Sequence, residues 1–237
     1  SDVYKRQRLN HKDFICRLFS RHFYFKCSIF FIRICSVLDN IQKSYIRKES
    51  IYGPDNYKPL PVVLSKAKGV WVWDVNDEKY IDMMSGYSAV SHGHVHPELL
   101  RVFHEQSSRL SLTSRAFYTD TLGPYLETIT KMTGFEMCLP MNSGAEAVET
   151  AIKASRRWAY RTKKVKPGKA EIIVADGNFH GRTTTIISFS SDENSKHDFG
   201  PHTPGFVSIK YGCSKSLEAA INKNTAAVLI EPIQGEG

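Results

Sequence analysis

The feature that most constrains the fold is a helix and strand pair between residues 143 and 175. Small and apolar residues recur there at the 3.6-residue period of an amphipathic helix, as far as Trp158. Ser143 and Glu146 have the three-residue spacing of a capping box, which predicts that the helix begins at Ser143. The apolar run of residues 171–175 then predicts a buried strand.

The same alternation continues toward the end of the chain. Residues 185–189, 206–209 and 226–230 are further strand candidates, and a short helix is expected at about residues 216–222. Helices that alternate with nearly continuous apolar strands indicate an α/β domain with a mostly parallel sheet.

The preceding segment has a different pattern. Residues 70–74 and 78–82 flank a polar turn, which predicts a β-hairpin. Pro97 suits the first turn of a helix, and a second helix is expected after Gly123-Pro124. We therefore expect three segments, with boundaries at 1–50 (a basic extension), 51–125 (hairpin and helices) and 126–237 (an incomplete large α/β domain).

The net charge of +8 would suit a protein that binds nucleic acid, but its distribution argues against that function. Residues 1–50 hold eleven Lys or Arg and four Asp or Glu, whereas residues 51–237 hold 21 and 20. The basic excess therefore lies in the extension and not on a folded face that could follow a phosphate backbone.

The extension contains an apolar run, residues 28–38, that is too short to span a bilayer and is interrupted by Arg33. A basic, acid-poor N-terminus suits a mitochondrial transit peptide, and spurious translated sequence explains it equally well. Residues 1–50 are therefore set aside. The five cysteines form no C-x-x-C pair, which favours free thiols in a reducing compartment, either cytoplasm or mitochondrial matrix.

Two glycine-containing turns could bind a ligand. Backbone amides at Ser143-Gly144-Ala145 could hold an anion, although a well-capped helix without a ligand also explains this turn, since Glu146 satisfies the same helix end. After the strand at 171–175, Phe179 could stack on a flat ring and Arg182 could clamp a carboxylate. The alternative is a plain connection with Phe179 packed inward and Arg182 solvated.

Two other runs carry weaker signals. Residues 231–237 follow a buried-type strand with two carboxylates, which turn chemistry also explains. Three histidines between residues 92 and 96 resemble a metal-ligand cluster, but a polar loop before a helix explains them as well, so we expect no metal.

Taken in order, these motifs resemble the class III, fold-type I pyridoxal-phosphate aminotransferases, from Asn56 to the end of the chain. The opening at residues 56–63 and the segment Thr113-Ser114-Arg115-Ala116-Phe117-Tyr118 favour the ornithine aminotransferase branch. The other matching runs are residues 73–75, 88–94, 139–151, 177–183, 199–201 and 231–236.

The resemblance implies roles for cofactor-binding residues. It places the phosphate of pyridoxal 5'-phosphate at Ser143, Gly144 and Ala145. It also implies that Phe179 stacks on the pyridine ring with His180 beside it. The remaining implied cofactor residue is Glu231, near the ring.

The resemblance also implies substrate roles. Tyr57 and Arg182 match groups that hold the α-carboxylate of ornithine, and Tyr87 matches a residue of the substrate channel. Glu236 matches a glutamate that pairs with a distant arginine and gates 2-oxoglutarate. The implied partners are these two substrates and a second copy of the chain, with no nucleic acid and no membrane.

The implied reaction moves the side-chain amine of ornithine to 2-oxoglutarate and gives glutamate 5-semialdehyde and glutamate. No lysine here matches the Schiff-base lysine of the family, so we expect an inactive fragment with no catalytic residue of its own. Acetylornithine or another ω-amino acid as donor is the alternative within the class. A non-catalytic binding module is the alternative outside it.

Overall fold

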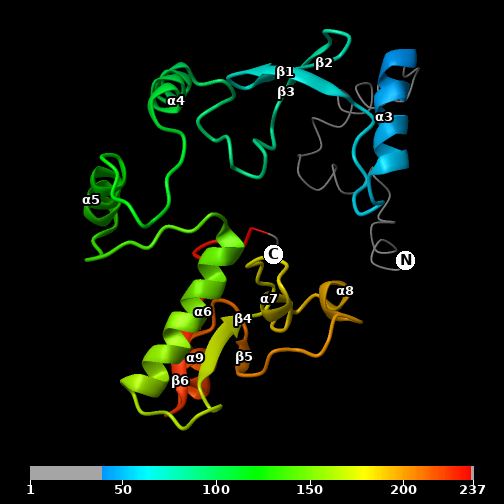
Figure 1. Cartoon of the computed structure of the whole chain (residues 1–237). Helices are drawn as coiled ribbons and strands as arrows, with labels where there is room; N and C mark the ends of the chain where they lie inside the picture. Colours follow the sequence, from blue (N-terminus) through cyan, green and yellow to red (C-terminus); the bar gives the residue numbers. More distant parts are fainter. Residues whose placement is uncertain (1–38, 236–237) are drawn as a thin grey trace. The chain divides into compact units, whose positions relative to one another are not determined.

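The structure is a computed structural model, and it describes residues 39–235. The chain divides between Leu122 and Gly123 into two compact units. We call residues 39–122 the N-terminal unit and residues 123–235 the C-terminal unit, and each is described by itself (Figure 1).

The N-terminal unit contains a three-stranded antiparallel sheet in the order β1-β2-β3 (Figure 1). The pairing of β2 with β3 confirms the hairpin that the sequence predicts. The helix expected at Pro97 is also present. The elements of this unit are α3 (Asn40–Tyr52), β1 (Leu64–Lys68), β2 (Trp71–Asp74), β3 (Lys79–Ile81) and α4 (Pro97–Arg109).

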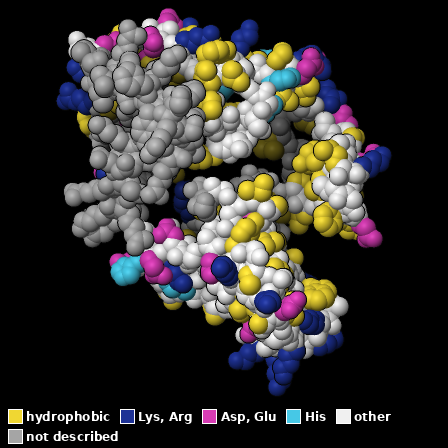
Figure 2. Space-filling view, turned by 180° about the vertical axis from the view of Figure 1, so that it is seen from behind, with side chains coloured by type: hydrophobic (Ala, Val, Ile, Leu, Met, Phe, Trp, Pro, Cys, Tyr) yellow, Lys and Arg dark blue, Asp and Glu magenta, His cyan; other side chains and the backbone are white. Residues whose placement is uncertain are grey.

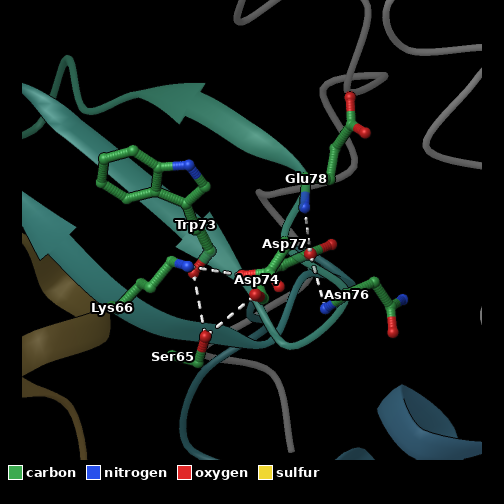
Figure 3. Close-up of polar contacts among 7 residues, drawn as sticks. All are labelled: Ser65, Lys66, Trp73, Asp74, Asn76, Asp77 and Glu78. Carbon is green, nitrogen blue, oxygen red and sulfur yellow. Dashed lines mark hydrogen bonds and ion pairs between the residues drawn. The ribbon is translucent and has the colours of Figure 1, made fainter.

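Asp74, at the end of β2, shapes the hairpin turn. Its carboxylate accepts hydrogen bonds of 2.9 Å from the amides of Asn76 and Glu78 (Figure 3). Asp77 adopts a left-handed backbone with φ of 65°, and the Nζ of Lys66 on β1 lies 2.6 Å from its carboxylate. An aspartate that bonds to amides two and four residues later favours a tight turn, which explains why the chain reverses here.

Helix α3 is attached to the same carboxylate. Asp39 caps the helix by accepting from the amide of Gln42. The side chain of Gln42, a residue only 8% exposed, donates to Asp74 at 3.0 Å. Helix α3 was not predicted, because most of it lies within residues 1–50, which were set aside as an extension.

The C-terminal unit is built on a parallel sheet in the order β5-β4-β6, which confirms the predicted α/β class. Helix α6 and strand β4 run in opposite directions, so the start of α6 lies at the end of the sheet where β4 finishes (Figure 1). The elements are α5 (Leu122–Thr133), α6 (Gly144–Arg161), β4 (Glu171–Ala175), α7 (Thr184–Ile187), α8 (Glu193–Lys196), β5 (Phe206–Ile209), α9 (Ser214–Ala220) and β6 (Thr225–Leu229).

The core of this unit lies where α6 and α7 meet the central strand. Ile152 of α6 packs with Ile172 and Val174 of β4, and Ile186 and Phe189 complete the cluster. All five are at most 5% exposed. Because full burial of such a side chain contributes about 1.5–3 kcal/mol, this cluster holds the helices on the sheet.

One strand prediction was wrong. Residues 185–189 begin within helix α7 instead of forming a strand. The β-branched run favours a strand by propensity, but the Thr183 hydroxyl accepts from the amide of Ile186 and caps a short helix. The helical turn also directs Ile186 and Phe189 into the core, so packing overrides the propensity.

Helix α5 has no fully buried residue, and two of its large apolar side chains are exposed. Tyr125 is 50% and Met132 is 77% exposed. Figure 2 shows hydrophobic side chains gathered over this helix. Among residues 39–235, no helix has both the length and the apolar character needed to cross a membrane.

Candidate functional site

Three loops gather where the parallel strands of the C-terminal unit end. The side chain of Gln234, after β6, donates to the carbonyl oxygen of Asp176, after β4, at 2.7 Å. The hydroxyl of Tyr211, after β5, lies 3.1 Å from the carbonyl oxygen of Glu231 and 2.9 Å from that of Pro232. In open α/β sheets ligands bind at this carboxyl edge, so the cross-linked loops form a candidate ligand site.

Asn178 ties the loop of residues 177–182 to the end of β4 and to Phe189. Its side-chain amide donates to the carbonyl oxygens of Ala175 at 2.6 Å and Phe189 at 3.2 Å. The amide of Gly177 donates to the hydroxyl of Ser191 at 2.8 Å. These bonds replace the strand ladder that ends at Ala175, and they fix the loop above the sheet.

Phe179 projects from this loop with 41% of its surface exposed, so the ring is not packed into the core. Its amide donates to the Glu231 carboxylate at 3.2 Å. The guanidinium carbon of Arg182 lies 5.2 Å from the centroid of the Phe179 ring, within the range of a cation–π contact. An aromatic face and a guanidinium therefore stand together at the sheet edge.

Gly181 brings the loop against the start of helix α6. Its φ of 128° is one that side-chain-bearing residues rarely adopt, and a Cβ there would lie 3.1 Å from the Cβ of Ala145 and 3.0 Å from Ile186. The two motifs singled out in the sequence are thus in direct contact, although 30 residues or more separate them in the chain.

The start of α6 confirms the predicted capping box. The Ser143 hydroxyl accepts from the amide of Glu146 at 3.2 Å, and the Glu146 carboxylate accepts from the amide of Ser143 at 3.1 Å. Within residues 39–235, no protein acceptor is bonded to the amides of Gly144 or Ala145. Two donors and the positive end of the helix dipole therefore remain for an anion.

His180 is partly buried, and its ring centroid is 6.0 Å from that of Phe189. Burial lowers the pKa of His180, and the nearby Glu231 carboxylate opposes this change. Its buried Nε2 atom has no hydrogen-bond partner among the described residues. A cavity of about 20 Å³ beside the loop has room for one water molecule.

The other predicted site residues do not belong to the described part of the C-terminal unit. Tyr57 and Tyr87 belong to the N-terminal unit, where they are 55% and 74% exposed. Tyr87 lies in a left-handed turn with φ of 55°. Glu236 lies outside the described residues. The substrate roles of these three residues stay predictions.

Two residues of this edge, Tyr211 and Gln234, were given no role from the sequence, although Gln234 lies within the run at residues 231–237. Local spacing could not predict their loop contacts, since their partners lie 20 or more residues away in the chain. A polar side chain within a few residues of the end of each apolar strand is the signal that could have indicated them, because parallel strands end at one edge.

Comparison with known proteins gives consistent results. Residues 52–237 match the family model described as aminotransferase class-III. An ornithine aminotransferase of Brevibacillus brevis is 56% identical over 191 residues, which are 81% of this chain and 48% of that protein. One of Bacillus cereus strain Q1 is 55% identical over 194 residues, 82% of this chain and 49% of that protein. The chain thus spans about half the length of these relatives.

Solved structures agree with the fold. An ornithine aminotransferase from Toxoplasma gondii ME49 matches with a TM-score of 0.80 and 40% identity, over 84% of this chain and 47% of that one. An acetylornithine aminotransferase from Elizabethkingia anophelis matches with a TM-score of 0.70 and 51% identity, over 82% and 48%. These matches confirm the fold-type I α/β class and the resemblance stated above. The chain belongs to the class-III aminotransferase family.

Proposed function

We propose that the protein to which this chain contributes is an ornithine aminotransferase that uses pyridoxal 5'-phosphate and 2-oxoglutarate. The observation that carries the proposal is the contact between the Phe179 loop and the start of α6, where a Cβ on Gly181 would lie 3.1 Å from Ala145. This contact sets an exposed aromatic face beside two free helix-start amides. The pair fits a ligand that is flat at one end and anionic at the other.

The phosphate of the cofactor would be held at the start of α6. Gly144 and Ala145 offer their amides, and their small side chains allow close approach of the phosphate oxygens. The Ser143 hydroxyl already accepts from Glu146 and retains its own proton for donation. The Glu146 carboxylate is bonded to the amides of Asn142 and Ser143, so it leaves the next two amides available.

The ring of the cofactor would lie against Phe179. The amide of Phe179 donates to the Glu231 carboxylate, and this bond fixes the position of the aromatic ring at the sheet edge. When bound, pyridoxal phosphate supplies an electron sink for the carbon that carries the transferred amine. Among the residues described, this chain's part is to bind, orient and cover that group.

The substrates would be oriented by charge. Arg182 can hold the α-carboxylate of ornithine through two parallel N–H bonds, together with the hydroxyl of Tyr57. Tyr87 would line the channel, and Glu236 would control access for 2-oxoglutarate. We further propose that the complete protein is a homodimer, as the resemblance to the family implies.

The complete protein tests the main proposal. It should convert ornithine and 2-oxoglutarate into glutamate and glutamate 5-semialdehyde, followed by the cyclised product of the aldehyde. A purified complete protein that binds pyridoxal phosphate but turns over no ω-amino donor would contradict the proposal.

The second candidate is an acetylornithine aminotransferase, which the neighbour from Elizabethkingia anophelis favours. Tyr57→Phe in the complete protein separates the two. If Tyr57 holds the α-carboxylate of ornithine, loss of its hydroxyl should raise the KM for ornithine about tenfold, because a hydrogen bond to a charged group is lost. Steady-state kinetics with ornithine and N-acetylornithine measure this. An unchanged KM for ornithine, with efficient use of N-acetylornithine, would favour the second candidate.

A further inference from the structure

Tyr211 links two loops of the candidate site, but the proposed function gives it no role. It follows strand β5, and its hydroxyl lies 3.1 Å from the carbonyl oxygen of Glu231 and 2.9 Å from that of Pro232. The single phenolic proton is shared between two successive carbonyl groups of the neighbouring loop. This contact fixes the backbone of the loop at the residue whose side chain reaches Phe179.

Glu231 connects Tyr211 to the loop that contains Phe179. One carboxylate oxygen accepts from the amide of Phe179 at 3.2 Å, and the other lies 3.5 Å from the amide of Gly235. The carboxylate therefore bridges its own loop and the loop with the aromatic face. Both of its oxygens are engaged with protein amides, which suits a residue that holds the loops more than one that contacts the cofactor directly.

We propose that Tyr211 is a positioning residue of the cofactor site, acting through Glu231 on Phe179. This inference rests on the proposed function. The hydroxyl of Tyr211 holds the Glu231 backbone, Glu231 holds the Phe179 amide, and the amide sets where the ring meets the cofactor.

The loops do not depend on Tyr211 for their existence. Gln234 independently ties the loop after β6 to the carbonyl of Asp176, and Asn178 ties the aromatic loop to Ala175. Removal of the Tyr211 hydroxyl should therefore leave the fold intact and weaken only the contacts that hold the Phe179 ring in position. Tyr211→Phe is thus a usable probe.

The first measurement uses the complete protein without cofactor. Hydrogen exchange of the Phe179 amide, followed by NMR, should be about fivefold faster in Tyr211→Phe, because a net hydrogen-bond contribution is lost from the support of Glu231. Tyr160→Phe is the matched control, since Tyr160 packs against a separate cluster around Ala159 and should leave the Phe179 amide unchanged. Equal exchange rates in the Tyr211→Phe and original chains would overturn the proposal.

A double-substitution cycle tests whether Tyr211 acts through Glu231. Glu231→Ala should speed exchange of the Phe179 amide about tenfold or more, because the amide loses a charged acceptor. Adding Tyr211→Phe should then have no further effect, since the two residues form one chain of contacts. Additive effects would mean that Tyr211 acts independently, and would overturn the proposed order.

Cofactor binding by the complete protein tests whether the contacts of Tyr211 affect the cofactor site. Tyr211→Phe should raise the dissociation constant for pyridoxal phosphate several-fold, while Tyr160→Phe should not change it. An unchanged dissociation constant would overturn the positioning role alone. Failure of the unsubstituted complete protein to bind pyridoxal phosphate would overturn the proposed function instead, so the two failures are distinguishable.

Discussion

Asp74 in the N-terminal unit and Glu231 in the C-terminal unit both hold loops, and they act over very different sequence distances. Asp74 accepts from the amides of Asn76 and Glu78 within the turn that it begins (Figure 3). Glu231 accepts from the amide of Phe179, 52 residues earlier in the chain. The first carboxylate organises a local turn, whereas the second joins two loops that only the folded sheet brings together.

The surroundings of the two carboxylates differ as well. Asp74 is 2% exposed and also accepts from the side chains of Gln42 and Tyr80, so each of its bonds is internal to the N-terminal unit. Glu231 is only partly buried, at the sheet edge where a ligand is expected. We infer that Asp74 mainly serves stability, and that Glu231 mainly serves the shape of the site.

The largest effect should follow from Asp74→Ala. Four donors lose their acceptor, and the buried amide of Gln42 has none to replace it, so the N-terminal unit should lose about 3–5 kcal/mol of unfolding free energy. Urea denaturation in a Trp158→Phe background measures this, because the remaining tryptophans, Trp71 and Trp73, both lie in β2.

Asp74→Asn is the matched control. The amide oxygen can still accept from the turn amides, so about half of the loss should be recovered. A loss below 1 kcal/mol in Asp74→Ala would contradict the view that this carboxylate organises the unit.

A smaller effect is expected from Gly181→Ala, in the loop whose Phe179 amide is bonded to Glu231. The new methyl group meets Ala145 and Ile186 at a left-handed backbone position, which should cost about 2–3 kcal/mol. Gly168→Ala shares a positive φ but has open space around its Cβ, so it should cost only about 1 kcal/mol. Native-state hydrogen exchange of the Ile173 amide in β4 measures the loss of unfolding free energy in both variants. Equal losses would show that the loop does not lie tightly on α6.

Ser143→Ala should cost about 1 kcal/mol, the usual loss when a helix N-cap is removed. The same exchange measurement applies. Ser155→Ala in the middle of α6 is the control, because it removes a hydroxyl without a capping role. If the two substitutions cost the same, the capping box contributes nothing measurable.

The smallest effect concerns Tyr80, which donates to Asp74, and it is a loss of stability that occurs only at high pH. Burial first, then the charge and hydrogen bond of Asp74, raise the pKa of Tyr80 to about 12. Since the folded state holds this proton more tightly, the stability it contributes is complete below pH 10 and is lost as the pH rises through 12. In Asp74→Asn the pKa should fall toward 10 without reaching it, as NMR of labelled tyrosine can show. An unchanged pKa would mean that burial alone raises it.

The sequence was sufficient for features that depend on neighbouring residues. The capping box of Ser143 and Glu146, strand β4 and the hairpin around Asp74 were all predicted, because each is specified by residues a few positions apart. The left-handed Gly181 could be noted as a glycine, but not assigned to its contact with Ala145.

Features that depend on the assembled fold could not be predicted in this way. The run at residues 185–189 has the propensity of a strand, yet its packing on Ile152 makes it begin as a helix. The bonds from Tyr211 to Glu231 and from Phe179 to Glu231 join residues that only the parallel sheet brings to one edge. The site residues came from family resemblance, whereas the contacts that hold them came from the structure.

The most direct test of the central claim is a crystal structure of the complete protein with pyridoxal phosphate. We expect the phosphate to lie within hydrogen-bonding distance of the Gly144 and Ala145 amides, and the Phe179 ring to cover one face of the pyridine. A phosphate bound elsewhere, or a Phe179 ring turned into the core around Phe189, would contradict this claim.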